Sequence, residues 1–237
     1  MTDYRWPKKN LVLIPIYNEA KYVIGVIEEV KKYICESSDI LAIDDGSTDS
    51  TPKLLKEIEN IKIITHDRNM GYGQTLIDGF NYAIEKGYKN VITIDCDWQH
   101  EPAHIMEFCD QLDDYDIISC SRYLKLSHEE PPPDRMAVNQ KITRRINEIT
   151  GFNITDSFCG FKAYSVASLK KLKLTEKNYG MPLQLWIQAW KHGFKIKEFP
   201  IGLIYFDRTR QFPGDLKNSE KRLKYYNDII DRELSDG

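Results

Sequence analysis

Residues 10–45 read NLVLIPIYNEAKYVIGVIEEVKKYICESSDILAIDD, and this stretch decides the fold class. An apolar run at 10–16 is followed by an amphipathic stretch at 19–35 and by a second apolar run at 40–43. The two runs have the length and composition of buried strands, and the stretch between them has the spacing of a helix. Two strands joined by a crossover helix are typical of a parallel α/β sheet.

The same alternation continues along the rest of the chain. Further strands are predicted at 61–65, 91–94, 116–120, 160–164 and 195–200. Further helices are predicted at 51–60, 71–86, 103–112, 135–150, 182–192 and 218–234. The sequence therefore predicts an α/β fold with a mostly parallel central sheet flanked by helices, in which the first half is a Rossmann-like nucleotide-binding unit.

Length, charge and cysteine content exclude several classes of protein. A chain of 237 residues with 33 basic and 36 acidic side chains is one large domain or two small ones, and its balance of charge does not favour nucleic acid as a partner. No apolar run approaches the ~20 residues that span a bilayer, and no signal peptide precedes the first strand, so we expect a cytoplasmic protein. Five cysteines without a CxxC pair favour reduced thiols.

Acidic side chains follow three of the predicted strands. Glu19 comes after the first strand, Asp44 and Asp45 after the second, and Asp95 and Asp97 after the strand at 91–94. Ligands of open α/β sheets bind beyond the carboxyl ends of the strands, so these groups are expected on one rim. Alternate positions of an extended segment point the same way, so Asp95 and Asp97 can share one Mg²⁺ or Mn²⁺ ion that also contacts a nucleoside diphosphate.

Two other interpretations of these polar residues stay open. Aspartates after strands also cap helices and shape turns, and Asp49 and Ser50 precede the predicted helix at 51–60. Residues 100–104 (HEPAH) match the zinc-binding HExxH pattern, but a proline belongs in the first turn of a helix and not in its middle. We therefore expect the helix to begin after His100, which separates the two histidines and argues against zinc.

Four motifs in this order resemble the family 2 inverting glycosyltransferases of the GT-A fold. They are PIYNE (15–19), DDGSTDST (44–51), RNMGYG (68–73) and DCDWQHEP (95–102), and the likeness spans roughly residues 10–210, most closely that of dolichol-phosphate mannose synthases and other polyprenyl-phosphate transferases. The resemblance implies nucleotide-binding residues at Pro15, Tyr17, Glu19, Asp44, Asp45 and Cys96, and metal ligands at Asp95, Asp97 and Gln99. Trp98 replaces a more usual leucine, so we expect it to alter the sugar pocket.

The second half of the chain resembles the acceptor side of those synthases. Arg122, Arg135 and Asn139 match the positions that gather the acceptor phosphate, although Asn139 replaces a usual serine. Arginine suits this task because its planar group contacts phosphate oxygens in pairs, while an ordinary salt bridge is the alternative for Arg122. Asp156 resembles a residue that closes the sugar side, and it is the candidate base if the acceptor is a hydroxyl.

Near the carboxyl terminus the pattern departs from the family. Arg208 and Arg210 are candidates for contacting the diphosphate, within the stretch FDRTRQFPGDLK at 206–217. We expect a single domain over 1–237, with a nucleotide-sugar and metal-binding half at 10–120, an acceptor half at 121–210 and a C-terminal helix at 211–237. Leu223, Tyr226 and Ile230 have the spacing that docks this last helix on the body.

The resemblance implies the inverting transfer of a sugar from a GDP-mannose or UDP-glucose type donor to a polyprenyl or dolichyl phosphate, dependent on Mg²⁺ or Mn²⁺. Asp97, Arg122 and Arg135 are the expected catalytic residues. Alternatives are a glycosyltransferase with a soluble sugar or protein acceptor, a nucleotidyltransferase, and a non-catalytic nucleotide-binding module. A lipid acceptor requires the protein to work at the cytoplasmic face of a membrane or with a membrane partner.

Overall fold

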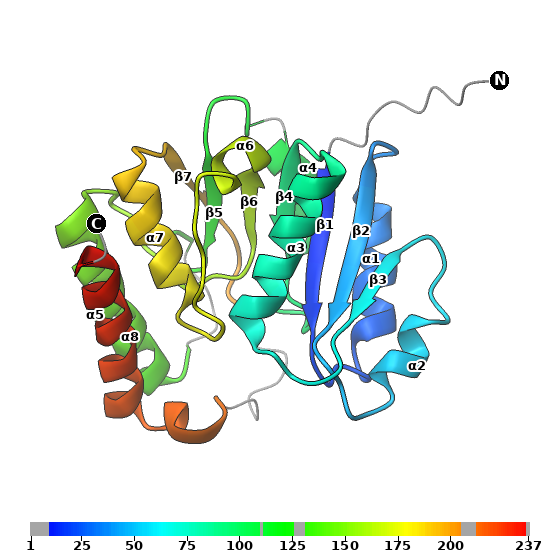
Figure 1. Ribbon diagram of the computed structural model, residues 1–237, viewed down its shortest axis with the longest axis horizontal. Coiled ribbons are helices and arrows are strands. Elements are labelled where there is room, and N and C mark those ends of the chain that lie inside the picture. The colour runs from blue at the N-terminus through cyan, green and yellow to red at the C-terminus, as the bar shows by residue number, and fades with distance from the viewer. Residues whose placement is uncertain (1–9, 110, 126–130, 205–211, 236–237) are drawn as a thin grey trace.

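The computed structural model describes residues 10–109, 111–125, 131–204 and 212–235, and this part of the chain forms one sheet of seven strands (Figure 1). The strands are β1 (Asn10–Ile16), β2 (Ser38–Asp44), β3 (Lys62–Thr65), β4 (Asn90–Thr93), β5 (Ile117–Ser121), β6 (Lys162–Ser165) and β7 (Ile196–Pro200). Their order is β3-β2-β1-β4-β6-β5-β7. Only β6 runs antiparallel to its neighbours, so the predicted mostly parallel sheet is confirmed.

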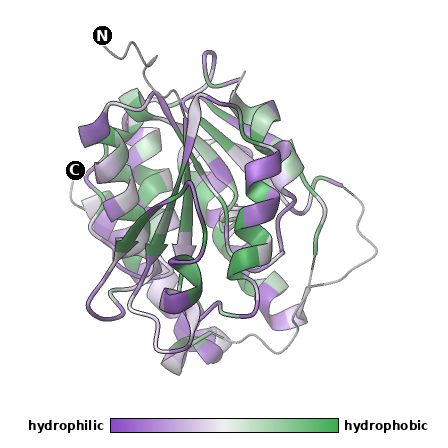
Figure 2. Cartoon of the chain, turned by 90° about the vertical axis from the view of Figure 1, so that its right-hand side faces the viewer, coloured by the Kyte–Doolittle hydropathy of each residue, from purple (hydrophilic) through white to green (hydrophobic). Residues whose placement is uncertain are grey.

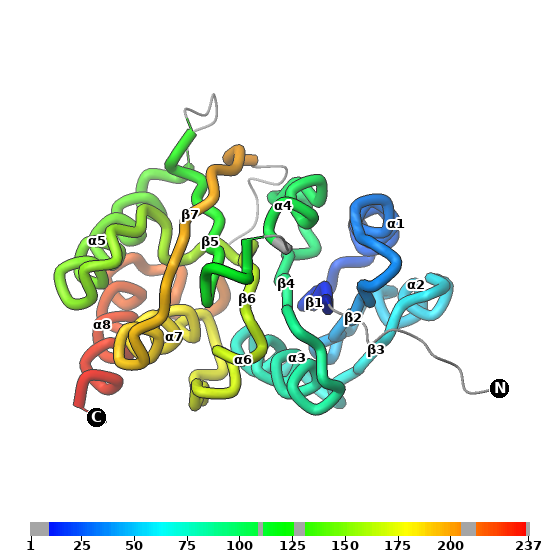
Figure 3. The backbone as a smooth tube through the Cα atoms, turned by 90° about the horizontal axis from the view of Figure 1, so that it is seen from above, coloured from blue at the N-terminus to red at the C-terminus, as the bar shows by residue number. Residues whose placement is uncertain are grey.

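Helices cover both faces of the sheet, as the view along it shows (Figure 3). They are α1 (Val23–Lys32), α2 (Thr51–Leu55), α3 (Tyr72–Lys86), α4 (Ile105–Cys109), α5 (Pro133–Thr150), α6 (Val166–Leu169), α7 (Met181–Lys191) and α8 (Ser219–Ser235). Short 3₁₀ turns occupy Pro102–His104 and Gly214–Lys217. Among the described helices, none has the length and apolarity needed to cross a membrane.

Alternate residues of the central strands supply two separate apolar cores. Leu11 and Leu13 of β1 belong to the core that also takes residues from α3, α5, α7 and α8, whereas Val12 and Ile14 belong to the core that takes residues from α1 and α4. This division follows from the two-residue period of a strand. All four side chains are fully buried, which is why β1 reads as an unbroken apolar run. Figure 2 shows such hydrophobic, green segments gathered in the interior between the helices.

Three predicted helices are shorter than expected, those at 19–35, 51–60 and 103–112, and the last is α-helical over Ile105–Cys109. The helix predicted at 19–35 begins only at Val23, since the backbone N–H groups of Glu19 and Ala20 donate to Thr51 and Asp49 in the neighbouring loop. The helix predicted at 51–60 ends at Leu55, after which the backbone N–H groups bond to the carbonyl three residues back, as in a 3₁₀ turn. The helix α6 was not predicted.

The sheet order creates a crevice between β1 and β4. The chain proceeds from β1 to β2 and β3 on one side of the sheet and then returns to β4 on the other side of β1. In register, Ile16 lies beside Asp44, and Leu13 lies beside Thr93. A reversal of this kind separates the loops that follow the two strands, so ligands of such sheets bind at this point.

Candidate active site

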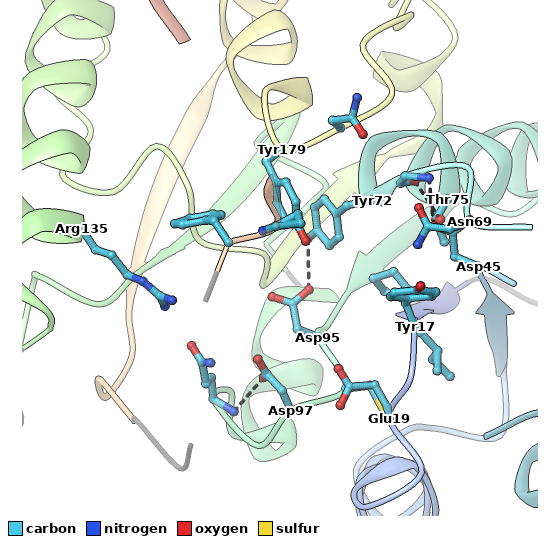
Figure 4. Close-up of a pocket in the computed structure, with 18 residues that line it drawn as sticks. Tyr17, Glu19, Asp45, Asn69, Tyr72, Thr75, Asp95, Asp97, Arg135 and Tyr179 are labelled. Carbon is cyan, nitrogen blue, oxygen red and sulfur yellow. Dashed lines mark hydrogen bonds between the residues drawn. The ribbon is translucent and has the colours of Figure 1, made fainter. Parts of the chain in front are cut away.

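A cavity of about 630 Å³ opens at the carboxyl ends of β1, β2 and β4. Its volume lies within the range of small-molecule sites. Nine of the residues singled out from the sequence line it: Pro15, Tyr17, Glu19, Asp45, Asp95, Cys96, Asp97, Gln99 and Arg135. The structure thus brings the acidic groups of three strand ends to one hollow (Figure 4).

A smaller cavity of about 170 Å³ adjoins the first, and its lining combines three arginines with several aromatic rings. Arg122, Arg135 and Asn139 contribute to its wall, as does Arg222, which the sequence did not suggest. The residues that line both cavities are Tyr72, Asp95, Gln99, Arg135, Tyr179 and Phe212. An acidic compartment and an arginine-rich compartment therefore meet along a common wall.

Two of the expected site residues that the structure describes do not lie on these walls. Asp44 and Asp156 are fully buried and line neither cavity. Asp44 accepts a hydrogen bond from the backbone N–H of Ser47 at 3.0 Å, which shapes the turn after β2. Arg208 and Arg210 lie outside the described residues.

The carboxylate of Asp45 organises the loop between β3 and α3. It accepts hydrogen bonds from the backbone N–H groups of Met70 at 2.7 Å and Gly71 at 2.9 Å, and its Oδ1 lies 2.7 Å from Nδ1 of His66. Gly71 has a φ of +103°, and a β-carbon there would lie 2.4 Å from the carbonyl oxygen of Lys177. Only glycine fits this conformation and this close approach.

Polar residues of the second motif join the loops after β1 and β2. The side-chain oxygen of Asn18 accepts from the backbone N–H of Thr48 at 2.8 Å, and Oδ1 of Asp49 accepts from that of Thr51 at 2.9 Å. Although burial opposes it, hydrogen bonding from Thr51 and Ala20 lowers the pKa of Asp49. Ser50 makes no capping hydrogen bond with its side chain, so of the two candidates it is Asp49 that holds the turn before α2.

Asp95 and Asp97 reach the cavity from the loop that follows β4. Asp95 Oδ1 accepts a hydrogen bond from the Tyr72 hydroxyl at 3.0 Å, and Asp97 Oδ1 accepts from the backbone N–H of Gln99 at 3.1 Å (Figure 4). Burial, and next the charge of Asp95, raise the pKa of Tyr72 well above its ordinary value. Trp98, with a φ of +60°, packs beside Gly25 of α1 and lines neither cavity, and its expected effect on a sugar pocket stays a prediction.

The oxygen atoms at this site suit a hard divalent cation. Asp95 and Asp97 supply two carboxylates, and Gln99 adds an amide on the same wall. In the described part of the chain, no group of three or more His, Cys, Asp or Glu side chains is arranged to hold a metal. Asp95, Asp97 and Gln99 fit a Mg²⁺ or Mn²⁺ ion that takes its remaining oxygens from a bound phosphate and water.

His100 does not form a zinc site with His104. It precedes the 3₁₀ turn, is 5% exposed, and its Nδ1 accepts a hydrogen bond from the backbone N–H of Asp95 at 3.4 Å. Burial lowers its pKa to about 4, so the ring is neutral at pH 7. His100 thus supports the Asp95 loop.

Arg122 makes a buried ion pair with Asp156. Its Nε and Nη2 donate to the two carboxylate oxygens at 2.7 and 2.9 Å. Although burial opposes ionisation, the guanidinium lowers the pKa of Asp156. Asp156 is therefore a charged group that orients Arg122, which lines the smaller cavity. Asp156 itself is fully buried and lines neither cavity, so it is poorly placed to act as a base.

Three aromatic side chains that the sequence did not single out form the common wall. The rings of Tyr72 and Tyr179 are stacked with centroids 5.9 Å apart, and Phe212 meets Tyr179 edge to face at 5.5 Å. The guanidinium of Arg135 lies 5.0 Å from the centre of the Phe212 ring. The RNMGYG motif was a signal for Tyr72, but nothing local marks Tyr179 or Phe212.

The chain matches known proteins over most of its length. A family model described as Glycosyl transferase family 2 matches residues 11–173. Polyprenol monophosphomannose synthase of Mycolicibacterium smegmatis is 28% identical over 204 residues, covering 82% of this chain and 77% of that protein. UDP-N-acetylglucosamine--dolichyl-phosphate N-acetylglucosaminyltransferase of Methanococcus voltae is 29% identical over 221 residues, covering 82% and 85%.

A solved structure supports the same assignment of the fold. Glucosyl-3-phosphoglycerate synthase from Mycobacterium tuberculosis, in complex with Mn²⁺, UDP-glucose and phosphoglyceric acid, has a TM-score of 0.75 and 16% sequence identity. The match covers 96% of this chain and 80% of that one. At this identity the likeness concerns the fold alone, and it confirms the fold that the sequence motifs imply.

Proposed function

The chain belongs to glycosyl transferase family 2, a glycosyltransferase family, and we propose that it transfers a sugar from a nucleoside diphosphate sugar to the phosphate of a polyprenyl or dolichyl phosphate. The names of the two relatives given above refer to such lipid phosphates. The observation that carries the proposal is the junction of the two cavities. An acidic site suited to a metal-bound diphosphate opens directly onto a compartment lined by Arg122 and Arg135.

The larger cavity is the proposed donor site. Pro15, Tyr17 and Glu19 would contact the nucleoside, while Asp95 and Asp97, with Gln99, would hold Mg²⁺ or Mn²⁺. When bound, the cation supplies positive charge beside the departing diphosphate. The structural neighbour was solved with Mn²⁺ and UDP-glucose bound, which supports a metal ion and a nucleotide sugar as the ligands proposed for this fold. Asp45 would act mainly by holding the loop that borders the donor.

The smaller cavity is the proposed acceptor site. Arg122 and Arg135 offer guanidinium groups to a phosphate, and Asn139, whose amide donates to the Tyr123 hydroxyl at 3.3 Å, lies beside them. A phosphate monoester has a second pKa near ~6 and is mostly dianionic at neutral pH. Its oxygen can then attack the anomeric carbon directly as the bond to the diphosphate breaks, which inverts that carbon. No base is required, and this agrees with the locked position of Asp156.

A polyprenyl phosphate is embedded in a bilayer, which sets a condition on the proposal. The acceptor cavity must face a membrane surface, or a partner that presents the lipid, during turnover. A soluble phosphate acceptor would impose no such condition. The two cases share the chemistry of the cavity and differ only in what carries the phosphate.

A panel of donors and acceptors tests the proposed function. GDP-mannose and UDP-glucose are each supplied with Mn²⁺ or Mg²⁺ to a short polyprenyl phosphate, to the corresponding polyprenol, and to phosphoglyceric acid, and release of the nucleoside diphosphate is measured. We expect release that requires both the metal and the phosphate of the lipid. Equal release with the polyprenol, or release of pyrophosphate in place of the nucleoside diphosphate, would contradict the proposal.

A further inference from the structure

The Asp95 carboxylate is confined by three parts of the chain. Oδ1 accepts the hydrogen bond from Tyr72 at the start of α3, and the His100 ring, whose Nδ1 accepts from the Asp95 backbone, lies 3.9 Å from Oδ2 without donating to it. On the remaining side, a β-carbon at Gly160 would lie only 2.2 Å from Oδ2. Gly160 is fixed in turn, because its carbonyl oxygen accepts a hydrogen bond from the Thr93 hydroxyl at 2.6 Å. The Asp95 side chain therefore has little freedom to rotate.

Tyr72 is also fixed in position. Its ring is stacked on Tyr179 with an interplanar angle of 7°. The glycines on either side pack directly against a loop, since β-carbons on Gly71 and Gly73 would lie 2.4 and 2.3 Å from the carbonyl oxygens of Lys177 and Glu176. The backbone N–H of Gln74 donates to the carbonyl of Lys177 at 3.0 Å. The hydroxyl that reaches Asp95 is thus carried on a rigid support.

The same loop is tied to the last helix. Glu176 accepts hydrogen bonds from Tyr225 at 2.8 Å and from Arg232 at 3.0 Å, both on α8. The side-chain oxygen of Gln184 accepts from the backbone N–H of Glu176 at 2.8 Å. A residue at the donor site is therefore anchored through the loop to the far end of the chain.

We propose that Tyr72 is a positioning residue that orients the Asp95 carboxylate for a divalent cation, an inference that rests on the proposed function. Asp97 takes a hydrogen bond from its own loop, so the two carboxylates are oriented by different means. Removing a hydrogen-bond partner of a metal ligand typically lowers metal affinity by about 10- to 100-fold. Tyr72 lines both cavities, so it also places the oriented carboxylate where donor and acceptor meet.

Tyr72→Phe tests the inference because it removes one oxygen atom and keeps the ring stack. Mn²⁺ is titrated by electron paramagnetic resonance into the full chain saturated with UDP or GDP, whichever the donor panel selects. We expect the apparent Kd for Mn²⁺ to rise about 10-fold, with nucleotide affinity in the absence of metal unchanged. Tyr88→Phe is the matched control, because Tyr88 donates at 2.5 Å to Asp39 near the amino-terminal ends of β2 and β4, away from the cavities.

A double-mutant cycle with Asp95→Asn separates this role from general packing. If Tyr72 acts through Asp95, Tyr72→Phe has no further effect on Mn²⁺ binding in that background. An unchanged Kd for Mn²⁺ in Tyr72→Phe, or the same loss with and without Asp95, overturns the inference alone. Failure of the unmodified protein to bind Mn²⁺ with either nucleotide overturns the proposed function as well.

A second variant covers the case in which Tyr72→Phe does not fold cooperatively. Tyr179→Leu keeps the Tyr72 hydroxyl and removes the ring against which Tyr72 stacks. We expect weaker Mn²⁺ binding in this variant too, by a smaller factor than the loss of the hydroxyl itself. Wild-type Mn²⁺ binding in Tyr179→Leu would then contradict the inference.

Discussion

Arg122 and Asp156 form a two-pronged ion pair in which the Asp156 side chain is fully buried and the Arg122 side chain is 14% exposed. The backbone N–H groups of Arg122 and Phe158 also donate to this carboxylate, at 3.3 and 3.2 Å. The pair thus closes the loop before β6 onto the end of β5. Arg122 also lines the smaller cavity, so the pair links folding to the candidate site.

Asp156→Asn should destabilise the protein strongly. Removing one member of a buried pair leaves the other charge uncompensated, which costs about 3–5 kcal/mol. We expect a lower midpoint of urea unfolding with an unchanged m-value. Asp113→Asn is the control, because the Lys89–Asp113 pair is exposed and should contribute little. Equal stability of Asp156→Asn and the unmodified protein would show that the pair contributes nothing net.

Because of His100, the free energy of unfolding should begin to fall at a pH above the range in which carboxylates titrate. Its pKa of about 4 lies below the ordinary value of 6.5, so the unfolded chain binds the extra proton first. The stability that His100 contributes is complete above pH 6.5 and is lost as the pH falls toward 4, by roughly 3 kcal/mol. Unfolding measured in EDTA from pH 7 to 4 should show this slope, and His100→Gln should flatten it.

Gly160→Ala should impair the metal site while the fold is kept. The added β-carbon would lie 2.2 Å from Oδ2 of Asp95, so the carboxylate must turn away. We expect a loss of turnover of about 10-fold or more, partly recovered at high Mn²⁺. Gly202→Ala is the matched control, since the nearest atom to its β-carbon would be 3.8 Å away. A Gly160→Ala variant with full activity would show that the Asp95 orientation is unimportant.

Strands β1, β2 and β4 could be predicted from sequence because each holds a local run of buried, mostly apolar residues. The predicted and observed bounds of β1 are both 10–16. The direction of β6 could not be predicted, since antiparallel pairing with β4 and β5 depends on contacts with segments far along the chain. The short helix α6 has too few residues to show a helical period.

Some residues of the candidate site could likewise be predicted from local sequence, and others could not. Asp95 and Asp97 could be placed at the cavity because they directly follow a strand. Asp44 and Asp45 are adjacent in sequence, yet Asp44 is buried at the end of β2 and only Asp45 lines the cavity. Tyr179 and Phe212 reach the wall through the packing of distant loops, which no local pattern reveals.

Asp95→Ala combined with Asp97→Ala should abolish metal-dependent turnover without unfolding the protein. Both carboxylates reach the cavity wall, so their loss removes the proposed metal ligands and relieves repulsion between like charges. We expect turnover to fall by at least about 100-fold, with an unchanged or higher thermal midpoint. Activity that survives in the double variant at saturating Mn²⁺ would refute the assignment of these residues.

Arg135→Gln should weaken binding of the acceptor more than binding of the donor. The guanidinium lies on the wall of both cavities, but its neighbours in the smaller one are the basic and amide groups Arg122 and Asn139. A hydrogen bond to a charged group contributes about 1.5–3 kcal/mol, so KM for the polyprenyl phosphate should rise by about 10- to 100-fold. Arg135→Lys keeps the charge but not the planar fork and should recover only part of the loss. The control is Arg144→Gln, an exposed position on the same helix that lines neither cavity. If Arg135→Gln changed KM for the nucleotide sugar and left that for the lipid phosphate unaltered, Arg135 would belong to the donor site instead.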